Sequence, residues 1–331
     1  MIVTGGLGFI GSNYILHALK GLKLGRITNI DSLSYGSNPE NLREVQNAPT
    51  YKFVKADLTD ISIIMSEVAN ADVVVHFAAE SHVDRSISDP RKFLQSNVMG
   101  TFNLLEAARH SKVRRFIHIS SDEVYGSAPP GETFRENTPL NPSSPYSASK
   151  AAAEMLALAY HKTYGLPIVV LRCTNNFGPR QFPEKLIPKT IIRALLGLRI
   201  PVYGNGQQIR DWIHVYDFCK AIDLAIMKGV NGSIYNVSAG NEVSNLEIVT
   251  RILNILRKDV SLIEFVEDRP GHDFRYSLDS SRITRELAWK TELPLSTALE
   301  STVEWYVENR NWWKRLLDEK VLSPTPWKEK W

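Results

Sequence analysis

Residues 4–11 read TGGLGFIG, and this glycine-rich segment decides the fold of the chain. It follows the short β-branched run 2–3, leads into a helical apolar pattern over 10–20, and contains both Gly6-x-Gly8-x-x-Gly11 and Gly5-x-x-Gly8-x-x-Gly11. The glycines permit a tight turn and a close backbone approach to a pyrophosphate, which then faces the N-terminus of the helix. A plain glycine-rich turn is the alternative, but a strand before the segment and a helix after it predict a dinucleotide-binding βαβ unit.

Asp31 stands where this motif needs an acidic residue, because it ends the next β-branched run 20 residues after Gly11. Its carboxylate can accept hydrogen bonds from both ribose hydroxyls and repels a 2′-phosphate, which predicts NAD rather than NADP. Asp57-Leu58, after the third run, is a candidate to meet the adenine, although an Asp there can also cap the following helix.

Further along the chain, β-branched runs alternate with longer helical patterns. We expect strands at 2–3, 27–30, 51–54, 72–77, 115–120 and 167–172, and helices at 10–20, 61–69, 91–110 and 146–164. Such alternation predicts an α/β fold, a Rossmann-type doubly wound parallel sheet covered on both faces. Apolar strands such as 73–75 agree, since both of their sides would be buried.

The regular alternation of strands and helices ends near residue 175, beyond which prolines and glycines divide the chain into short pieces. Helical patterns return at 215–228, 245–257 and 298–317. We expect an NAD-binding Rossmann domain over 1–175, with returning segments near 213–240 that include a strand at 234–237. Residues 176–331 are expected to form mainly a smaller α/β substrate-binding domain.

Composition is average for a globular protein, with 43% hydrophobic residues, 23% charged residues and a formal charge of +3. The charge is too small to indicate a nucleic-acid partner, and no apolar run is long enough to span a membrane. Without a basic-then-apolar leader, a cytoplasmic protein is expected, with Cys173 and Cys219 as buried thiols. No metal site is expected.

Tyr146 and Lys150 stand four residues apart at the start of a predicted helix, so both side chains emerge on one face. An ammonium beside a phenol favours the phenolate and should lower the pKa of Tyr146, as would a nearby positive nicotinamide. The pair predicts a base that takes a proton from an alcohol while a hydride leaves for the cofactor.

A second candidate is Ser121-Asp122-Glu123, which directly follows the strand predicted at 115–120. Ligands bind at the carboxyl ends of parallel strands in such sheets. Two carboxyl groups with separated pKa values supply one acid and one base, which indicates an elimination in addition to oxidation. The alternative is a capping Asp followed by a solvated Glu.

These residues resemble the extended short-chain dehydrogenase/reductase superfamily (the NAD-dependent epimerase/dehydratase family) and, within it, the dTDP-glucose 4,6-dehydratases. The resemblance spans nearly the whole chain. It is carried by TGGLGFIGS (4–12), FAAESHVDRSI (77–87), SSDEVYG (120–126), PYSASKA (145–151), RCTNNFGP (172–179), PEKLIP (183–188), IRDW (209–212) and RPGHD (269–273).

The resemblance implies a lyase that converts dTDP-glucose to dTDP-4-keto-6-deoxyglucose and water with tightly held NAD. Tyr146, with Lys150 and Ser121, would deprotonate the C4 hydroxyl as hydride passes to NAD. Glu123 would remove the C5 proton, Asp122 would protonate the leaving C6 hydroxyl, and hydride would return to C6.

It also implies two sets of binding residues. Those near NAD are Gly5, Gly8, Phe9, Ile10, Gly11, Asp31, Ser32, Asp57, Leu58, Ala78, Ala79, Ser81, Ser96, Tyr146, Lys150 and Asn176. Those near the sugar nucleotide are Ser81, Ser121, Asp122, Glu123, Asn175, Lys185, Leu186, Pro201, Val202, Tyr203, Arg210, Asn245, Arg269 and His272. Lys185, Arg210 and Arg269 would share a diphosphate.

Two departures from the family are visible: Ser121 stands where Thr is frequent, and the segment before the glycines is a residue or two shorter. Relatives are typically homodimers built on a four-helix bundle, for which the helices at 91–110 and 146–164 are the candidates, although apolar helix faces are more often core. Alternatives are a UDP-sugar 4,6-dehydratase, a UDP-hexose 4-epimerase that uses Tyr146 and NAD alone, and a non-enzymatic NAD-binding redox sensor, which would be expected to lose Tyr146 or Lys150.

Overall fold

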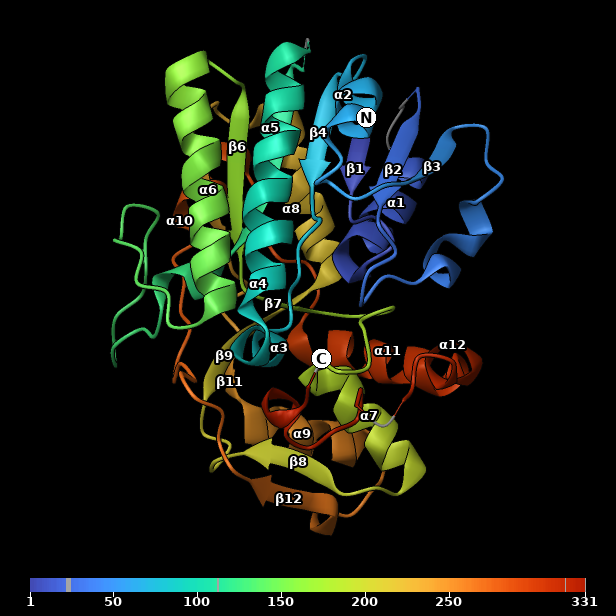
Figure 1. The fold of residues 1–331 in the computed structure, drawn as a ribbon. Helices are drawn as coiled ribbons and strands as arrows, with labels where there is room; N and C mark the ends of the chain where they lie inside the picture. Colours follow the sequence, from blue (N-terminus) through green and yellow to red (C-terminus); the bar gives the residue numbers. More distant parts are fainter. Residues whose placement is uncertain (22–24, 112, 319, 331) are drawn as a thin grey trace.

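The structure is a computed structural model that describes residues 1–21, 25–111, 113–318 and 320–330. Its centre is a sheet of parallel strands in the order β10-β6-β5-β4-β1-β2-β3 (Figure 1). The strands are β1 (Ile2–Thr4), β2 (Ile27–Asp31), β3 (Tyr51–Lys55), β4 (Val73–His76), β5 (Arg115–Ser121), β6 (Ile168–Cys173) and β10 (Ile234–Val237). This order confirms the expected doubly wound Rossmann-type sheet.

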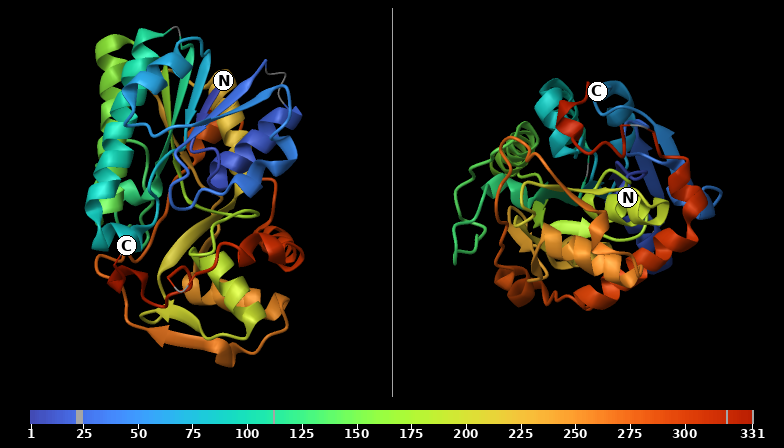
Figure 2. Two further views of the ribbon diagram at one scale, coloured as in Figure 1. Left: turned by 45° about the vertical axis from the view of Figure 1, so that its right-hand side comes forward. Right: turned by 90° about the horizontal axis from the view of Figure 1, so that it is seen from below.

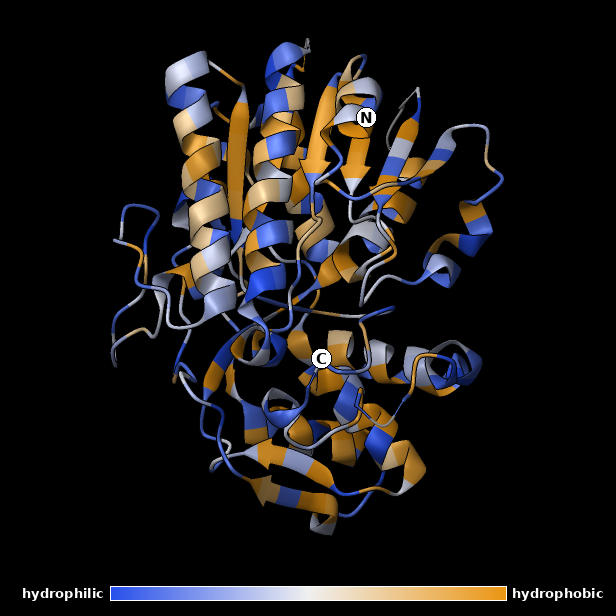
Figure 3. Cartoon of the chain, in the orientation of Figure 1, coloured by the Kyte–Doolittle hydropathy of each residue, from blue (hydrophilic) through white to orange (hydrophobic). Residues whose placement is uncertain are grey.

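Helices cover both faces of this sheet (Figure 1), because its strands are apolar on both sides. On one face, the strands pack against α1 (Phe9–Gly21), α8 (Val215–Lys228) and α10 (Ser281–Leu287). On the other face lie α2 (Ile61–Val68), α5 (Gly100–His110) and α6 (Pro145–Tyr164). Neighbouring residues of β1 belong to opposite faces. Val3 is part of the apolar core shared with α1 and α8, and Ile2 is part of the core shared with α2 and α5. The orange strands of Figure 3 show this continuous apolar character.

A smaller lobe lies beyond the carboxyl ends of the strands, below the sheet in Figure 1 and in the left view of Figure 2. It contains a sheet of β11 (Glu242–Ser244), β9 (Ile209–His214) and β7 (Asn175–Phe177), and the parallel pair β12 (Ile263–Val266) and β8 (Ile200–Tyr203). Its helices are α7 (Leu186–Leu196), α9 (Asn245–Ile255), α11 (Leu295–Glu308) and α12 (Arg310–Lys314). A separate apolar core joins α7, α9 and α11.

Shorter helical segments connect these elements. They are η1 (Pro39–Val45), α3 (Val83–Ser88), α4 (Pro90–Phe93), the π-helix η2 (Leu94–Met99), η3 (Asp122–Tyr125), η4 (Val260–Leu262) and η5 (Pro326–Lys328). None of the helices in the described ranges is both long and apolar enough to cross a membrane.

Two helix predictions need correction. The helix expected at 91–110 is divided into α4, η2 and α5 by a π-helical stretch, and the one expected at 298–317 is divided at Asn309 into α11 and α12. At the second break, the side-chain amide of Asn309 donates a hydrogen bond to the Trp305 carbonyl at 2.8 Å. The apolar spacing continues through both breaks, so periodicity alone could not reveal them.

Candidate active site

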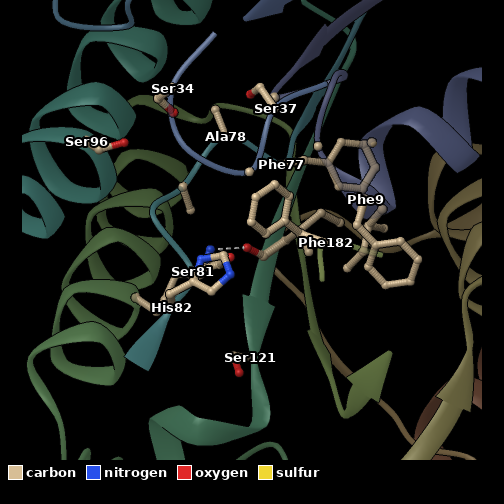
Figure 4. A pocket seen from close by; sticks show the side chains of 18 of the residues that line it. Phe9, Ser34, Ser37, Phe77, Ala78, Ser81, His82, Ser96, Ser121 and Phe182 are labelled. Carbon is tan, nitrogen blue, oxygen red and sulfur yellow. Dashed lines mark hydrogen bonds between the residues drawn. The ribbon is translucent and has the colours of Figure 1, made fainter. Parts of the chain in front are cut away.

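A single pocket at the carboxyl ends of β1, β2, β4 and β5 brings together most of the predicted residues. All the residues expected near NAD line it, as do Ser121, Asp122 and Glu123, together with Asn175 and Lys185 from the substrate set. Figure 4 shows part of the lining, which includes both aromatic rings and serine hydroxyls: Phe9, Phe77, Phe182, Ser34, Ser37, Ser81, Ser96 and Ser121.

The glycine segment of the pocket is packed too tightly for side chains. A Cβ on Gly11 would lie 2.4 Å from the Gly5 carbonyl oxygen, and one on Gly5, whose φ is +69°, would lie 2.7 Å from the Ala78 Cα. Helix α1 begins at Phe9 and carries no acidic residue in its first turn, so its positive end is available to an anion. This cradle fits the pyrophosphate of a dinucleotide.

Asp31 is held at the pocket edge by three donors. The Leu7 amide and the Leu33 amide each donate to its carboxylate at 2.9 Å, and the Ser37 hydroxyl donates at 2.7 Å. A carboxylate retains further lone pairs after these bonds, so it can still accept from ribose hydroxyls. The three donors fix the orientation of the Asp31 carboxylate, and its negative charge suits a ribose that carries no 2′-phosphate.

Asp57 also lines the pocket, and the structure resolves the alternative raised for it. The N-cap of α2 is Asp60, whose side chain accepts from the Ile63 amide. Asp57 instead accepts from the amide and hydroxyl of Thr59 at 2.8 and 2.7 Å. Asp57 is therefore not the cap of α2.

Helix α6 and strand β5 supply the chemical groups. Ser144 caps α6, with Pro145 in its first turn, so the helix begins immediately before Tyr146. Lys150 donates from Nζ to the Ile119 carbonyl at 2.6 Å, which fixes its ammonium against the end of β5. Burial lowers the pKa of Lys150 to about 8.

The expected lowering of the Tyr146 pKa is wrong for this structure. Burial raises the Tyr146 pKa well above its usual value, the charge of Glu123 raises it further, and a hydrogen bond with Ser121 opposes the rise. Lys150 gives its hydrogen bond to a backbone carbonyl. The phenolate therefore needs positive charge from another source.

The two acidic residues lie in the turn η3, where the Ser121 side chain accepts from the Glu123 amide at 3.2 Å. Burial and then the charge of Glu123 raise the Asp122 pKa well above its ordinary value. Burial also raises the Glu123 pKa, but Arg269, Lys185 and Arg210 oppose that rise. Ser121 is the cap, Asp122 is buried, and Glu123 is half-buried in the pocket lining, which argues against a capping Asp and a Glu on the outer surface.

Several predicted substrate residues lie outside this pocket. They are Leu186, Pro201, Val202, Tyr203, Arg210, Asn245, Arg269 and His272. Arg269 donates to Asp84 at 2.9 Å, Tyr203 donates to the same carboxylate at 3.0 Å, and Arg210 donates to the Asp273 carbonyl at 2.8 Å. Both arginines act on the pKa of Glu123, so they lie close to it while bound to protein oxygens. Of the three proposed diphosphate ligands, the pocket lining includes Lys185 alone.

The pocket wall also contains an aromatic group that was not among the residues predicted from the sequence. Tyr35, His82 and Phe182 line it, with the Tyr35 ring 5.1 Å from His82 and 4.8 Å from Phe182. Tyr35 also donates to Glu184 at 2.6 Å, which links the loop after β2 to the smaller lobe. Because Tyr35 and His82 follow β2 and β4, their place at the carboxyl ends of parallel strands was a usable signal.

Comparison with known proteins identifies the family of the chain. The sequence model of the family described as GDP-mannose 4,6 dehydratase matches residues 2–302. A dTDP-glucose 4,6-dehydratase from Streptomyces niveus is 46% identical over 98% of both chains, and one from Escherichia coli is 44% identical over 96% of both.

Solved structures give the same result. The dTDP-glucose 4,6-dehydratase DesIV from Streptomyces venezuelae, solved with NAD bound, has a TM-score of 0.94 at 44% identity, covering 96% of this chain and 99% of that one. The UDP-glucose 4-epimerase of Thermus thermophilus, also in complex with NAD, has a TM-score of 0.85 at 30% identity, covering 93% and 99%. The chain therefore belongs to the NAD-dependent epimerase/dehydratase family and, within it, to the dTDP-glucose 4,6-dehydratases.

Proposed function

We propose that this protein is an NAD-dependent lyase that converts dTDP-glucose to dTDP-4-keto-6-deoxyglucose and water. The observation that carries the proposal is the pair Asp122 and Glu123, which share one pocket with Tyr146, Lys150 and the dinucleotide cradle. An epimerase acting at C4 needs a base and NAD but no acid–base pair for elimination. Relatives of about 45% identity that bear the dehydratase name support the same reaction.

NAD would be held by the glycine cradle, by Asp31 and by the pocket residues at the ends of β3 and β4. When bound, NAD supplies a hydride acceptor for C4, a hydride donor for C6 and, in its oxidised form, a positive ring that favours the Tyr146 phenolate. Asp31 disfavours a 2′-phosphate by charge repulsion.

The residues of the chain then divide the proton transfers among them. The Tyr146 phenolate takes the proton of the C4 hydroxyl and becomes neutral. Before that transfer, the charge of Lys150, held on the Ile119 carbonyl, helps to stabilise the phenolate. The C4 ketone acidifies the C5 proton, which Glu123 removes. Asp122, whose raised pKa favours its protonated form, gives its proton to the C6 hydroxyl, which leaves as water. Glu123 finally returns a proton to C5.

Lys185 would contact the sugar nucleotide from the smaller lobe, since its ammonium already reaches the Ser81 carbonyl at 2.7 Å. Arg210 and Arg269 are proposed to join it at the diphosphate by exchanging their present protein oxygens for phosphate oxygens. We propose accordingly that residues 1–175, with the returning segments near 213–240, hold NAD, and that 176–331 hold mainly the sugar nucleotide. The pairing of β10 with β6 supports this division.

Turnover of dTDP-glucose and UDP-glucose, followed by mass spectrometry of products formed in deuterated water, tests the proposal. We expect deuterium at C5, loss of the C6 oxygen, and faster turnover of the dTDP sugar. A C4 epimer that retains its C6 oxygen would instead establish an epimerase, and preference for UDP-glucose would change the assigned nucleotide.

We also propose a homodimer built on the face of η2, α5 and α6. Helices α5 and α6 lie side by side in Figure 1, and η2 contacts both. Large apolar side chains are exposed on these elements: Leu94, Met99, Phe102 and Met155. Burying such a patch against a second copy is the usual solution for a surface of this kind. Light scattering should give twice the monomer mass for the protein and a smaller mass for Met99→Glu. A cytoplasmic location is proposed as well, supported by two free, buried cysteines.

A further inference from the structure

Helix α6 presents three side chains, one turn apart, to the end of strand β5. Tyr146 is hydrogen-bonded with Ser121, and Lys150 donates to the Ile119 carbonyl at 2.6 Å. The third, Glu154, accepts from the Ser120 hydroxyl at 2.7 Å. Each of the last three residues of β5 thus has a partner on α6, and only Glu154 has no role in the proposed reaction.

Glu154 also forms a buried ion pair. Its side chain is 0% exposed and that of its partner, Arg172 on β6, is 2% exposed. The Arg172 Nε lies 3.1 Å from both carboxylate oxygens, and Nη2 donates to the same carboxylate. Arg172 is the register partner of Ser120, so the pair spans the junction of β5, β6 and α6.

Arg172 then reaches the turn that carries the acidic pair. Its Nη1 donates to the hydroxyl of Tyr125, the last residue of η3, and its guanidinium carbon lies 4.5 Å from the centre of that ring. Tyr125 in turn donates to Asn236 of β10 at 2.9 Å. The path from α6 to η3 therefore runs through an ion pair and a tyrosine, all of them buried.

Stability gives no sufficient reason for this arrangement, because a buried ion pair can often be replaced by apolar residues at no cost in folding free energy. The pair instead fixes the position of the turn η3 relative to helix α6, and both elements carry residues of the same proposed reaction. We propose that Glu154 and Arg172 are positioning residues that clamp the turn η3 to α6, and so set Asp122 and Glu123 relative to Tyr146. This inference rests on the proposed function for its catalytic consequence.

The clamp predicts different effects on the two halves of the reaction. Tyr146 and Lys150 have their own contacts with Ser121 and Ile119. Asp122 and Glu123 also contact Ser121 at the start of their turn, but the far end of that turn is held by Arg172 through Tyr125. Loss of the clamp should therefore slow elimination more than oxidation. A displacement of about 1 Å in such a group can cost about 100-fold in rate.

The test compares the wild-type protein with Glu154→Gln, Arg172→Lys and the double variant Glu154→Met with Arg172→Met. Asp217→Asn is the matched control, because Asp217 is a buried carboxylate that binds the backbone amides of Glu292 and Leu293 outside the pocket. Stopped-flow absorbance of reduced nicotinamide reports oxidation by its rise. Its decay reports the hydride return to C6, which cannot occur before elimination and therefore slows when elimination slows. Amide hydrogen exchange over residues 121–126 reports the turn without substrate.

We expect the double variant to melt near the wild-type temperature, with KM within about 3-fold and elimination slowed about 10- to 100-fold. Oxidation should slow less, exchange over 121–126 should accelerate, and Arg172→Lys should recover part of the elimination rate. Asp217→Asn should change neither rate ratio nor exchange in the turn.

Two results would overturn the clamp. One is unchanged exchange over 121–126 in the double variant, and the other is a parallel fall of both rates in proportion to the loss of folded protein. If wild-type protein forms no product from dTDP-glucose, the proposed function fails, and the exchange measurement still decides the clamp.

Discussion

Asp122 and Glu123 are neighbours in the chain, but their carboxyl groups face different surroundings. Asp122 is 3% exposed, accepts from the Ser121 hydroxyl at 3.0 Å through Oδ1, and has no partner for Oδ2 among the described residues. Glu123 faces the positive charges of Arg269, Lys185 and Arg210, which oppose the effect of its burial. Burial raises the pKa of both groups, but the positive charges oppose the rise strongly only at Glu123, so the shared arrangement favours the proton on Asp122 over Glu123.

Separate replacement of the two carboxyl groups should stop the reaction at different points. We expect Asp122→Asn and Glu123→Gln each to lower turnover of dTDP-glucose by about 10²- to 10⁴-fold, the usual contribution of general acid–base catalysis. In deuterated water, Asp122→Asn should still exchange the C5 hydrogen, whereas Glu123→Gln should not. Near-normal activity in both variants would favour a C4 epimerase.

The charge of Glu123 should also control the protonation of Tyr146. Because that charge contributes to the high Tyr146 pKa, Glu123→Gln should shift the pH dependence of C4 oxidation to lower pH. Stopped-flow measurements of cofactor reduction across the pH range check this. An unchanged profile would mean that the two groups are not coupled during the reaction.

Lys150 should make folding stability depend on alkaline pH. Its folded-state pKa is about 8 against an ordinary 10.5, so between these values the unfolded chain binds more protons and stability rises with pH. Relative to Lys150→Met, the wild-type free energy of unfolding should rise by up to about 3 kcal/mol across this window. Denaturant titrations at several pH values provide the measurement, and parallel curves for the two proteins would contradict it.

Two glycines of α1 offer a matched test of the dinucleotide cradle. Gly11→Ala places a Cβ 2.4 Å from the Gly5 carbonyl oxygen, whereas a Cβ on Gly21 meets nothing within 4 Å. Gly11→Ala should therefore reduce bound NAD at least about 10-fold, because the added methyl group prevents the close approach of the backbone to the pyrophosphate. Gly21→Ala should retain it and gain up to about 1 kcal/mol of stability. NAD released from purified protein by heating measures both, and equal NAD contents would exclude the cradle.

The sequence predicted the features that depend on local pattern. Strand and helix periodicity located the Rossmann sheet, and the rule that ligands meet the carboxyl ends of parallel strands brought Asp31 and Ser121 to one pocket. It could not predict that Arg269 would bind Asp84, 185 residues away, or that Lys150 would bind a backbone carbonyl. These hydrogen-bond partners are determined by side-chain packing between segments far apart in the chain, and such packing produces no periodic pattern in the sequence.

The Tyr146 prediction shows the same limit in electrostatics. Spacing correctly placed Tyr146 and Lys150 on one helix face, but the effect on pKa depends on desolvation and on Glu123, 23 residues earlier in the chain. Sequence spacing reports which groups are neighbours, not how much water each one loses.

The position of strand β10 determines whether the NAD-binding half can be produced as a separate fragment. It pairs with β6 from Ile234 to Val237, after the chain has already passed through the smaller lobe. A fragment ending near residue 175 would leave the outer edge of β6 bare, and β6 is buried along its whole length. Exposed apolar edges recruit other chains. The NAD-binding half is therefore not a portable module: expressed alone, it should aggregate instead of folding into a separate cofactor-binding protein.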